Sequence, residues 1–254
     1  MKMPTTPQAA AESSIRRARR DAGLSASPAT PRGEPRWQRR KDARPAELLT
    51  AALELFAERG FAGTRLEDVA TRAGVSKGTL YLYFANKEDL FKAVVRQGLV
   101  SPLVEVRDLI ESYDGATADL LRILVKGWWE RIGATAHAGI QKLMIAEAAN
   151  FPDLARFYID EVILPGQATM ARIIERGILR GEFRPVDAAQ VAHLLAAPFL
   201  LIAVWRHGFG HAVQAQLPSL SDAPALLETH IDILTRGLAV AGTPQRKKTE
   251  GPAQ

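Results

Sequence analysis

Residues 65–84 contain two short runs with helical spacing on either side of one glycine, Gly74, and this arrangement limits the possible fold more than any other part of the chain. The first run, from Leu66, repeats apolar side chains three and four residues apart. In the second run Leu80 and Phe84 are four apart, so they share one helical face. A glycine between two helices suits the left-handed backbone of a sharp turn. The spacing therefore predicts a helix-turn-helix, a unit whose second helix enters the major groove of DNA.

The second run also carries side chains that suit contact with DNA. Those that project away from its apolar face are Lys77, Thr79, Tyr81 and Tyr83. A tyrosine can donate to a phosphate oxygen, while Gly78 lets the backbone approach closely and Lys87 can place a charge on the same strand. The alternative is that the aromatic residues are core, which suits Phe84. It does not suit both tyrosines together, because residues two apart on a helix face different directions.

Local signals predict a helix before this unit and another at its start. Pro45 fits a first helical position, where its missing N–H costs nothing, and Gly60 supplies a stop. Thr64 and Glu67 have the spacing of a capping box at the start of the next helix.

Two further N-caps and one break are predicted beyond the turn. Ser76 is an N-cap candidate for the third helix and Asn86 for the fourth. Gly98 and Pro102 should kink or break the fourth helix, because a proline removes an intrahelical hydrogen bond.

The rest of the chain reads as about five more helices, with kinks expected at Pro165 and Pro198. No β-alternation or hairpin dipeptide is present, so the predicted fold class is all-α. The expected helices are roughly 116–134, 138–149, 152–180, 186–208 and 223–240.

Residues 188–205 are apolar and just long enough to span a bilayer. However, Gln190, His193 and Pro198 lie inside this stretch, and an arginine flanks it on each side without a clear bias. We interpret it as a buried or dimer-forming helix and expect no membrane partner.

The basic charge of the protein is concentrated in its leading segment. Residues 1–44 carry 11 Lys and Arg against 4 Asp and Glu, whereas residues 45–98 carry 7 against 7 and residues 99–254 carry 15 against 17. The leading segment is rich in Pro, Ala, Ser and Arg with few large apolar residues, so we expect it to be disordered. A transit peptide is the alternative, but acidic residues interrupt the segment and no amphipathic stripe is present.

Metal and thiol chemistry find little support in the sequence. The chain has no cysteine, which excludes disulfides, thiolate metal sites and cysteine nucleophiles. His207 and His211 have the spacing of a helical metal pair, but two glycines between them disfavour a helix there. We therefore predict no metal and no cofactor.

Residues 50–91, "TAALELFAERGFAGTRLEDVATRAGVSKGTLYLYFANKEDLF", resemble the DNA-binding domain of the tetracycline-repressor (TetR) family of bacterial regulators. The ordered run "ALELFAERG", the core "GVSKGTLYLYF" and "NKEDL" carry the resemblance. Residues 151–166, "FPDLARFYIDEVILPG", and residues 174–201, "IERGILRGEFRPVDAAQVAHLLAAPFLL", are similar to the C-terminal domains of one subgroup.

The resemblance implies a three-helix DNA-binding head joined by a fourth helix to a helical body that dimerises and holds a small-molecule pocket. It implies a repressor that binds a near-palindromic operator in double-stranded DNA and is released by a ligand. By the same resemblance the last two helices form the homodimer interface, and the DNA-contact set of the head is Thr64, Ser76, Lys77, Gly78, Thr79, Tyr81, Tyr83 and Lys87.

Four segments follow from these observations. They are a disordered basic tail over 1–42, a DNA-binding domain over 43–103, a ligand-binding and dimerisation domain over 104–241, and a disordered tail over 242–254. The basic residues just before the first helix, Arg39, Arg40 and Arg44 among them, are placed to follow a minor groove. The long leader also admits two other readings, a tail that contacts nothing and a misassigned start.

Large side chains of the body are the candidates for the pocket, and together they favour a lipophilic or aromatic effector. Each is also a candidate for ordinary core. The ligand-binding set is Trp128, Trp129, Met144, Phe151, Tyr158, His193, Phe199 and Trp205, with Met170 as a further candidate.

Two other classes of protein compete with a regulator. Glu130, Glu147 and Glu161 could serve as acid–base groups of a helical enzyme, but no phosphate loop, nucleophile elbow or metal triad accompanies them. A non-specific DNA-packaging protein is disfavoured by the neutral head. We expect a cytoplasmic, nucleoid-associated regulator without enzymatic activity.

Overall fold

A computed structural model describes residues 36–209 and 222–240, with side chains from residue 45 onward. The chain divides into the units Met1–Asp42 and Ala43–Gln254, and of the first unit only the helical backbone of residues 36–42 is described. The described residues are helical, as the absence of β-alternation predicted. Apart from one isolated bridge between Phe183 and Ala239, they contain no β-pairing.

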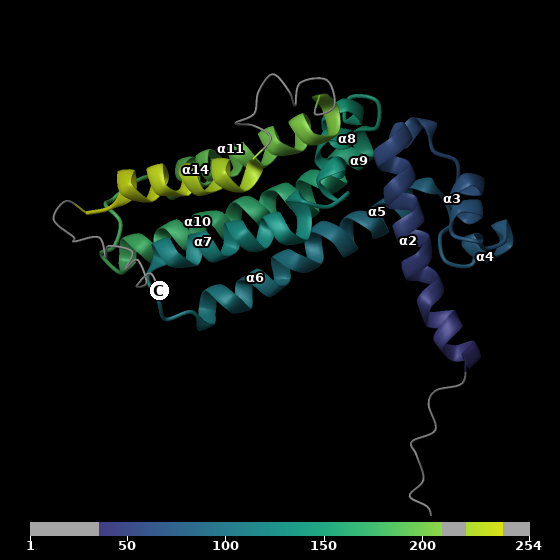
Figure 1. Cartoon of the computed structure of the whole chain (residues 1–254), viewed down its shortest axis with the longest axis horizontal. Helices are drawn as coiled ribbons and strands as arrows, with labels where there is room; N and C mark the ends of the chain where they lie inside the picture. The colour runs from purple at the N-terminus through teal and green to yellow at the C-terminus, as the bar shows by residue number, and fades with distance from the viewer. Residues whose placement is uncertain (1–35, 210–221, 241–254) are drawn as a thin grey trace, which may run out of the picture. The chain divides into compact units, whose positions relative to one another are not determined.

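Four helices build the N-terminal part of the larger unit (Figure 1). They are α2 (Arg36–Gly63), α3 (Leu66–Arg72), α4 (Lys77–Tyr81) and α5 (Lys87–Val95). Their shared core contains three phenylalanine rings, Phe56, Phe61 and Phe91, whose centroids lie 5.4 to 5.7 Å apart. All three side chains are almost fully buried, and Leu48 and Leu80 close the same cluster.

The first helix begins earlier than its proline predicted. Pro45 lies inside α2 rather than at its first position, because the preceding residues 36–44 are helix formers without a glycine or proline and the helix continues back through them. The predicted stop at Gly60 is confirmed, since this residue leaves the helical region with φ 76°. The basic residues that were predicted to precede the first helix and follow a minor groove thus lie on the first turns of that helix.

Two of the three predicted caps are confirmed. The Ser76 hydroxyl accepts the Thr79 N–H at 3.1 Å, and the Asn86 side chain accepts the Asp89 N–H at 2.8 Å. The capping box at Thr64 and Glu67 is wrong: α3 begins two residues after Thr64, and its N-cap position is Arg65, which makes no side-chain cap.

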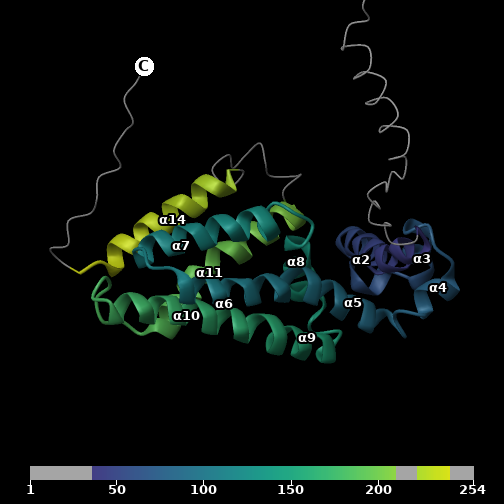
Figure 2. The same ribbon diagram turned by 90° about the horizontal axis from the view of Figure 1, so that it is seen from below.

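The C-terminal part contains longer helices, of which α10 and α11 lie side by side in both views (Figures 1 and 2). The five helices expected beyond residue 114 are all present, most of them with a short π-helical turn at one end or inside. The bounds are α6 (Ser101–Ser112), α7 (Thr117–Trp128), η2 (Trp129–Gly133), α8 (Ala138–Glu147), α9 (Pro152–Tyr158), η3 (Ile159–Ile163), α10 (Leu164–Leu179), α11 (Ala188–Val204), η4 (Trp205–Phe209) and α14 (Ala223–Leu238).

Two prolines mark the places where helical winding changes. The predicted break near Pro102 is a π-helical turn, η1 (Arg96–Val100), between α5 and α6. The turn η3 likewise precedes Pro165, which lies at the start of α10. A proline cannot donate the backbone hydrogen bond of a regular helix, and prolines and π turns are both recognised sites where helices change direction.

A second core lies among α7, α10, α11 and α14. Its fully buried members include Leu120, Ile174 and Ile231, one from each of three helices. Ala188–Phe209 is long and apolar enough to cross a membrane by length and composition, and about two fifths of its most apolar stretch is buried inside the protein.

Candidate nucleic-acid interface and internal cavity

The helix-turn-helix predicted over 65–84 is present, although its second helix is shorter than expected. Gly74 has φ 66°, the left-handed conformation that the turn requires. The Val75 N–H donates to the Ala70 carbonyl at 2.9 Å, which closes the end of α3. Leu80 is fully buried and fastens α4 to the core, so the opposite side of α4 faces outward.

The outward side of α4 and the turn after it carry two large exposed side chains. Tyr81 is 43% exposed and Leu82 is 83% exposed. Tyr83 is half-buried and packs beside Phe84, with 6.5 Å between the ring centroids. The two tyrosines thus point in different directions, as the spacing predicted, and neither is sealed from solvent.

Lys77 is held at the start of α4 by an ion pair. Its ammonium lies 2.5 Å from a carboxylate oxygen of Glu67 and 5.7 Å from the ring centroid of Tyr81. The hydrogen bond from Lys77 lowers the pKa of the Glu67 carboxyl below its usual value. Both side chains are more than half exposed, so the pair is weak and Lys77 can exchange Glu67 for another anion.

Gly78 is exposed, and packing inside the chain does not require a glycine there. A Cβ built at this residue would meet only the Ser76 hydroxyl, at 3.8 Å, an ordinary van der Waals distance. The Ser76 and Thr79 hydroxyls bond each other at 2.9 Å beside it. Space is therefore left outside the backbone of the first turn of α4.

Two residues of the predicted DNA-contact set have structural roles. Thr64 is 1% exposed, and its hydroxyl donates to the carbonyls of Leu55 and Gly60. The Lys87 ammonium donates to the Phe61 carbonyl at 2.7 Å and the Ala62 carbonyl at 3.3 Å, and burial lowers its pKa. We reassign both residues from DNA contact to the packing of the head, because their polar atoms face inward.

The three arginines that were predicted to follow a minor groove lie on α2. They are Arg39, Arg40 and Arg44, and their side chains are outside the described residues. His211 of the possible metal pair is also outside them. Within the described chain no cluster of three or more His, Asp or Glu side chains could hold a metal ion.

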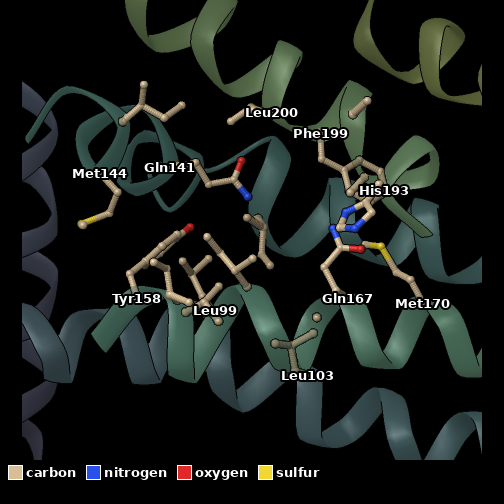
Figure 3. Close-up of a pocket in the computed structure, with 18 of the residues that line it drawn as sticks. Leu99, Leu103, Gln141, Met144, Tyr158, Gln167, Met170, His193, Phe199 and Leu200 are labelled. Atoms are coloured by element: carbon tan, nitrogen blue, oxygen red, sulfur yellow. The ribbon is translucent and has the colours of Figure 1, made fainter. Parts of the chain in front are cut away.

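The body contains a cavity of about 640 Å³ between α8, η3, α10 and α11 (Figure 3). Five of the eight predicted ligand-binding residues line it, and Met170, a further candidate, lines it too. Those five are Trp128, Met144, Tyr158, His193 and Phe199. The Trp128 and Phe199 rings stack with 4.3 Å between centroids and form one wall, and burial raises the pKa of Tyr158 above its usual value.

The other three predicted residues do not line this cavity. Trp129 packs under the Arg206 guanidinium, 5.1 Å from its ring centroid, and Trp205 contacts Phe209. Phe151 stacks edge-on against Phe61 with 4.8 Å between centroids, so it joins the body to the head. Adjacent aromatic residues on one helix face different directions, and residue type alone does not show which of them faces a cavity.

Several lining residues were not predicted from the sequence. Leu99 and Leu103 come from the helix that connects head and body, and Gln141 and Gln167 supply amides from α8 and α10. No sequence signal separates these residues from the rest of their helices: Gln141, for example, stands beside Lys142 in "AGIQKLMIA".

Two carboxylates beside the cavity bond to residues of the N-terminal part of the chain. Glu147, one turn after the cavity residue Met144, accepts the Ala62 N–H at 3.4 Å. Glu161 lies in η3 among cavity-lining residues and binds Arg96 of η1 through two hydrogen bonds of 2.7 and 2.5 Å. The guanidinium lowers the pKa of the Glu161 carboxyl. The walls of the cavity are thus bonded to the first turn after α5.

Large apolar side chains are exposed on the last two helices. Leu194 and Leu201 of α11 are 60% and 40% exposed, and Ile233 of α14 is 67% exposed. Gly237 leaves open space on the same helix, since a Cβ there would meet nothing within 4 Å. Exposed apolar faces of this kind mark sites of protein association.

Two families match the chain. Residues 48–94 match the family described as "Bacterial regulatory proteins, tetR family". Residues 114–240 match the family described as "Tetracyclin repressor-like, C-terminal domain".

Curated relatives and solved structures agree with these matches. The chain is 30% identical to the uncharacterized HTH-type transcriptional regulator YfiR of Bacillus subtilis, over 58% of this chain and 71% of that protein. It is 32% identical to the HTH-type transcriptional repressor KstR2 of Mycobacterium tuberculosis, over 57% and 71%. The solved structure of that ketosteroid transcriptional regulator has a TM-score of 0.58 at 26% identity, covering 78% of this chain and 95% of the other. A SmeT–triclosan complex, at 22% identity, shares the fold with a TM-score of 0.64 over 84% and 99%.

Proposed function

The chain belongs to the tetracycline-repressor family of bacterial transcriptional regulators, and we propose that it is a repressor that binds a near-palindromic operator as a dimer and leaves it when a lipophilic molecule enters the body. It is a regulator and not an enzyme. We place it in the cytoplasm, on the DNA of a bacterial cell.

One observation supports operator binding most directly: α4 is fixed by the buried Leu80 while Tyr81 and Leu82 stay exposed beside Gly78. In this proposal α4 lies in the major groove. Ser76, Lys77, Thr79 and Tyr83 accompany the exposed tyrosine as DNA contacts. The Tyr81 hydroxyl donates to a phosphate and Leu82 reaches a base edge, where an apolar side chain can contact a thymine methyl.

Selection of bound fragments from random DNA, followed by footprinting, tests this proposal. A single protected near-palindrome is expected, with half-site centres about 34–36 Å apart or a multiple of that distance. Uniform protection would indicate a DNA-packaging protein instead, and no protection would exclude operator binding.

We expect Tyr81→Phe to weaken binding to the selected operator by about tenfold or more, because a hydrogen bond to a charged group contributes about 1.5–3 kcal/mol. Affinity is measured by fluorescence anisotropy at fixed salt. Tyr113→Phe, the same change in the body, is the matched control and should leave affinity unchanged. Equal affinities for the two variants would show that the Tyr81 hydroxyl makes no bond to DNA.

Dimerisation is proposed through α11 and α14, whose exposed Leu194, Leu201 and Ile233 would pack against the same helices of a second copy. Ile233→Lys should convert the dimer to a monomer in sedimentation velocity, since a lysine would be buried without a partner. Leu179→Lys changes a residue that is 87% exposed at the end of α10 and should leave the dimer intact. A dimeric Ile233→Lys protein would place the interface elsewhere.

The bonds between cavity and head suggest how a ligand would act. Ile159, Val162 and Ile163 of η3 line the cavity, while Glu161 of the same turn holds Arg96 after α5. A ligand that displaces η3 would pull on α5 and so shift the spacing of the two heads of a dimer. Typical coupling energies of about 1–3 kcal/mol correspond to about 5–150-fold in operator affinity.

A further inference from the structure

The cavity wall is largely apolar among its described residues, and His193 is its one basic side chain. Leucine, isoleucine, alanine, methionine and aromatic side chains make up most of it, and no Lys, Arg, Asp or Glu lines it. An ionised group buried there would lose its hydration without gaining a counter-ion, which is strongly unfavourable. Any part of an effector that is buried away from His193 and from the solvent-exposed side of the cavity is therefore uncharged.

The side-chain amide oxygens of two glutamines in the wall lack hydrogen-bond partners. The side-chain oxygens of Gln141 and Gln167 are both buried, and neither has a hydrogen bond within the described part of the protein. Buried polar atoms without a partner are rare in proteins because they are costly. The amide nitrogen and oxygen can exchange places by rotation, so each glutamine can serve a donor or an acceptor.

The two amides come from different walls. Gln141 belongs to α8, whereas Gln167 belongs to α10 and lies next to His193 of α11. Figure 3 shows Gln141 on one side of the cavity and Gln167 with His193 on the other, with apolar side chains between them. A molecule that satisfies both amides must carry a polar group at each of two separated positions on an apolar frame.

We propose that the effector is an uncharged, largely apolar molecule with a hydroxyl or carbonyl group at each end, and that Gln141 and Gln167 are the residues that recognise these two groups. This inference rests on the proposed function only in taking the cavity as the effector site. It distinguishes such molecules from free fatty acids, whose carboxylate would meet no Lys or Arg in the wall.

Three probes of equal chain length test the proposal by isothermal titration calorimetry on the full chain. They are decanediol with a hydroxyl at each end, decanol with one hydroxyl, and decanoate. Their flexibility lets the two ends reach the two amides at any separation up to the length of the extended chain. Decanediol should bind about threefold to tenfold more tightly than decanol, the gain from one additional hydrogen bond. Decanoate should bind about a hundredfold more weakly than decanol, or not detectably.

The variants Gln141→Met and Gln167→Met remove one amide each while keeping the length of the side chain. Each should reduce the preference for decanediol over decanol to about one. Met144→Leu is the control, an apolar change in the same wall that should leave this preference unaltered. A ratio of affinities for two probes is insensitive to a general loss of fold or of cavity volume.

Three results would overturn the proposal: decanoate binding as tightly as decanol, a diol preference that survives in both glutamine variants, or no binding of either alcohol. The outcome is separate from the test of operator binding. Should no DNA be selected while the probe preferences appear as stated, the proposed repressor function fails and the recognition of uncharged molecules stands.

Discussion

The hydroxyl of Thr64 holds together the end of α2 and the approach to α3. Gly60 turns the chain out of the helix, which leaves carbonyls near that end without their usual helical donors. Thr64 donates to two of them, Leu55 at 3.2 Å and Gly60 at 2.7 Å, and Lys87 donates to the next two, Phe61 and Ala62. Thr64 and Lys87 thus supply the hydrogen-bond donors for four backbone carbonyls at the end of α2.

Thr64→Val should therefore reduce the free energy of unfolding by about 1–3 kcal/mol, because the shape is kept and the buried carbonyls lose their donor. Urea unfolding followed by circular dichroism measures this change. Thr71→Val is the matched control: its hydroxyl bonds the Glu67 carbonyl at 2.8 Å on an exposed face, and the expected change is small. Equal stability of the two variants would show that the buried hydroxyl contributes nothing.

Single residues were predictable where the deciding contact is local. Ser76 and Asn86 were predicted as caps from their residue type and position. Each accepts a bond from an amide three residues ahead, so the contact lies within the same short stretch of sequence. Thr64 has the same residue type, but its role depends on carbonyls four and nine residues back, at the end of another helix. Its side chain therefore faces the core, and the capping-box spacing was misleading.

Among the elements, the π-helical turn η1 is held in an unusually close contact. Gly98 of η1 packs directly against the His137 ring, which precedes α8, and the Thr135 hydroxyl bonds the ring nitrogen of His137 at 3.1 Å. A Cβ on Gly98 would overlap that ring. The connection between α5 and α6 thus has a fixed neighbour in the body.

Gly98→Ala should cost about 1–3 kcal/mol of stability by overpacking, and adding His137→Ala should restore part of this loss. The double-mutant cycle is measured by thermal unfolding. Gly127→Ala is the control: its Cβ would meet nothing within 4 Å, so alanine should stabilise the helix by about 0.5–1 kcal/mol. A loss of stability from Gly98→Ala that His137→Ala does not relieve would mean that the backbone, not the ring, rejects the methyl group.

The helices themselves were largely predictable, and the cavity only in part. Spacing placed every helix beyond residue 114 to within a few residues, because amphipathic periodicity is a property of one segment, whereas no bounds were predicted for α6. A cavity is formed between segments, so its polar members, Gln141 and Gln167, carried no distinguishing pattern. Trp129 and Trp205 were included for their size, although their rings face other walls.

At the scale of the whole molecule, the excess of basic residues and the helix-turn-helix lie in different parts of the chain. The helix-turn-helix region 45–98 is formally neutral, and several of its cations are already paired, as Arg72 is with Glu54 and Glu58. The basic excess lies in residues 1–44. We therefore propose that long-range attraction to DNA comes mainly from the leading segment and operator choice from α4.

Deleting residues 1–40 should lower operator affinity and flatten its salt dependence with little change in the selected sequence. Each phosphate that the shortened protein no longer neutralises reduces the slope of log K against log salt by about 0.9. Deletion of residues 1–35 is the comparison, since it keeps α2 and the arginines at its start. The slope is obtained from titrations at several salt concentrations. An unchanged slope in both proteins would mean that the leading segment does not bind DNA.

The π-helical turn η1 affects how the chain would tolerate the deletion of one residue. A π turn accommodates one residue more than an α turn, and each residue of a helix rotates the side chains that follow by about 100°. Loss of a single codon within residues 96–100 would convert η1 to ordinary α winding, because the wider turn holds one residue more for the same full turn. The connection between α5 and α6 is thus a place where the chain can lose one residue and stay helical.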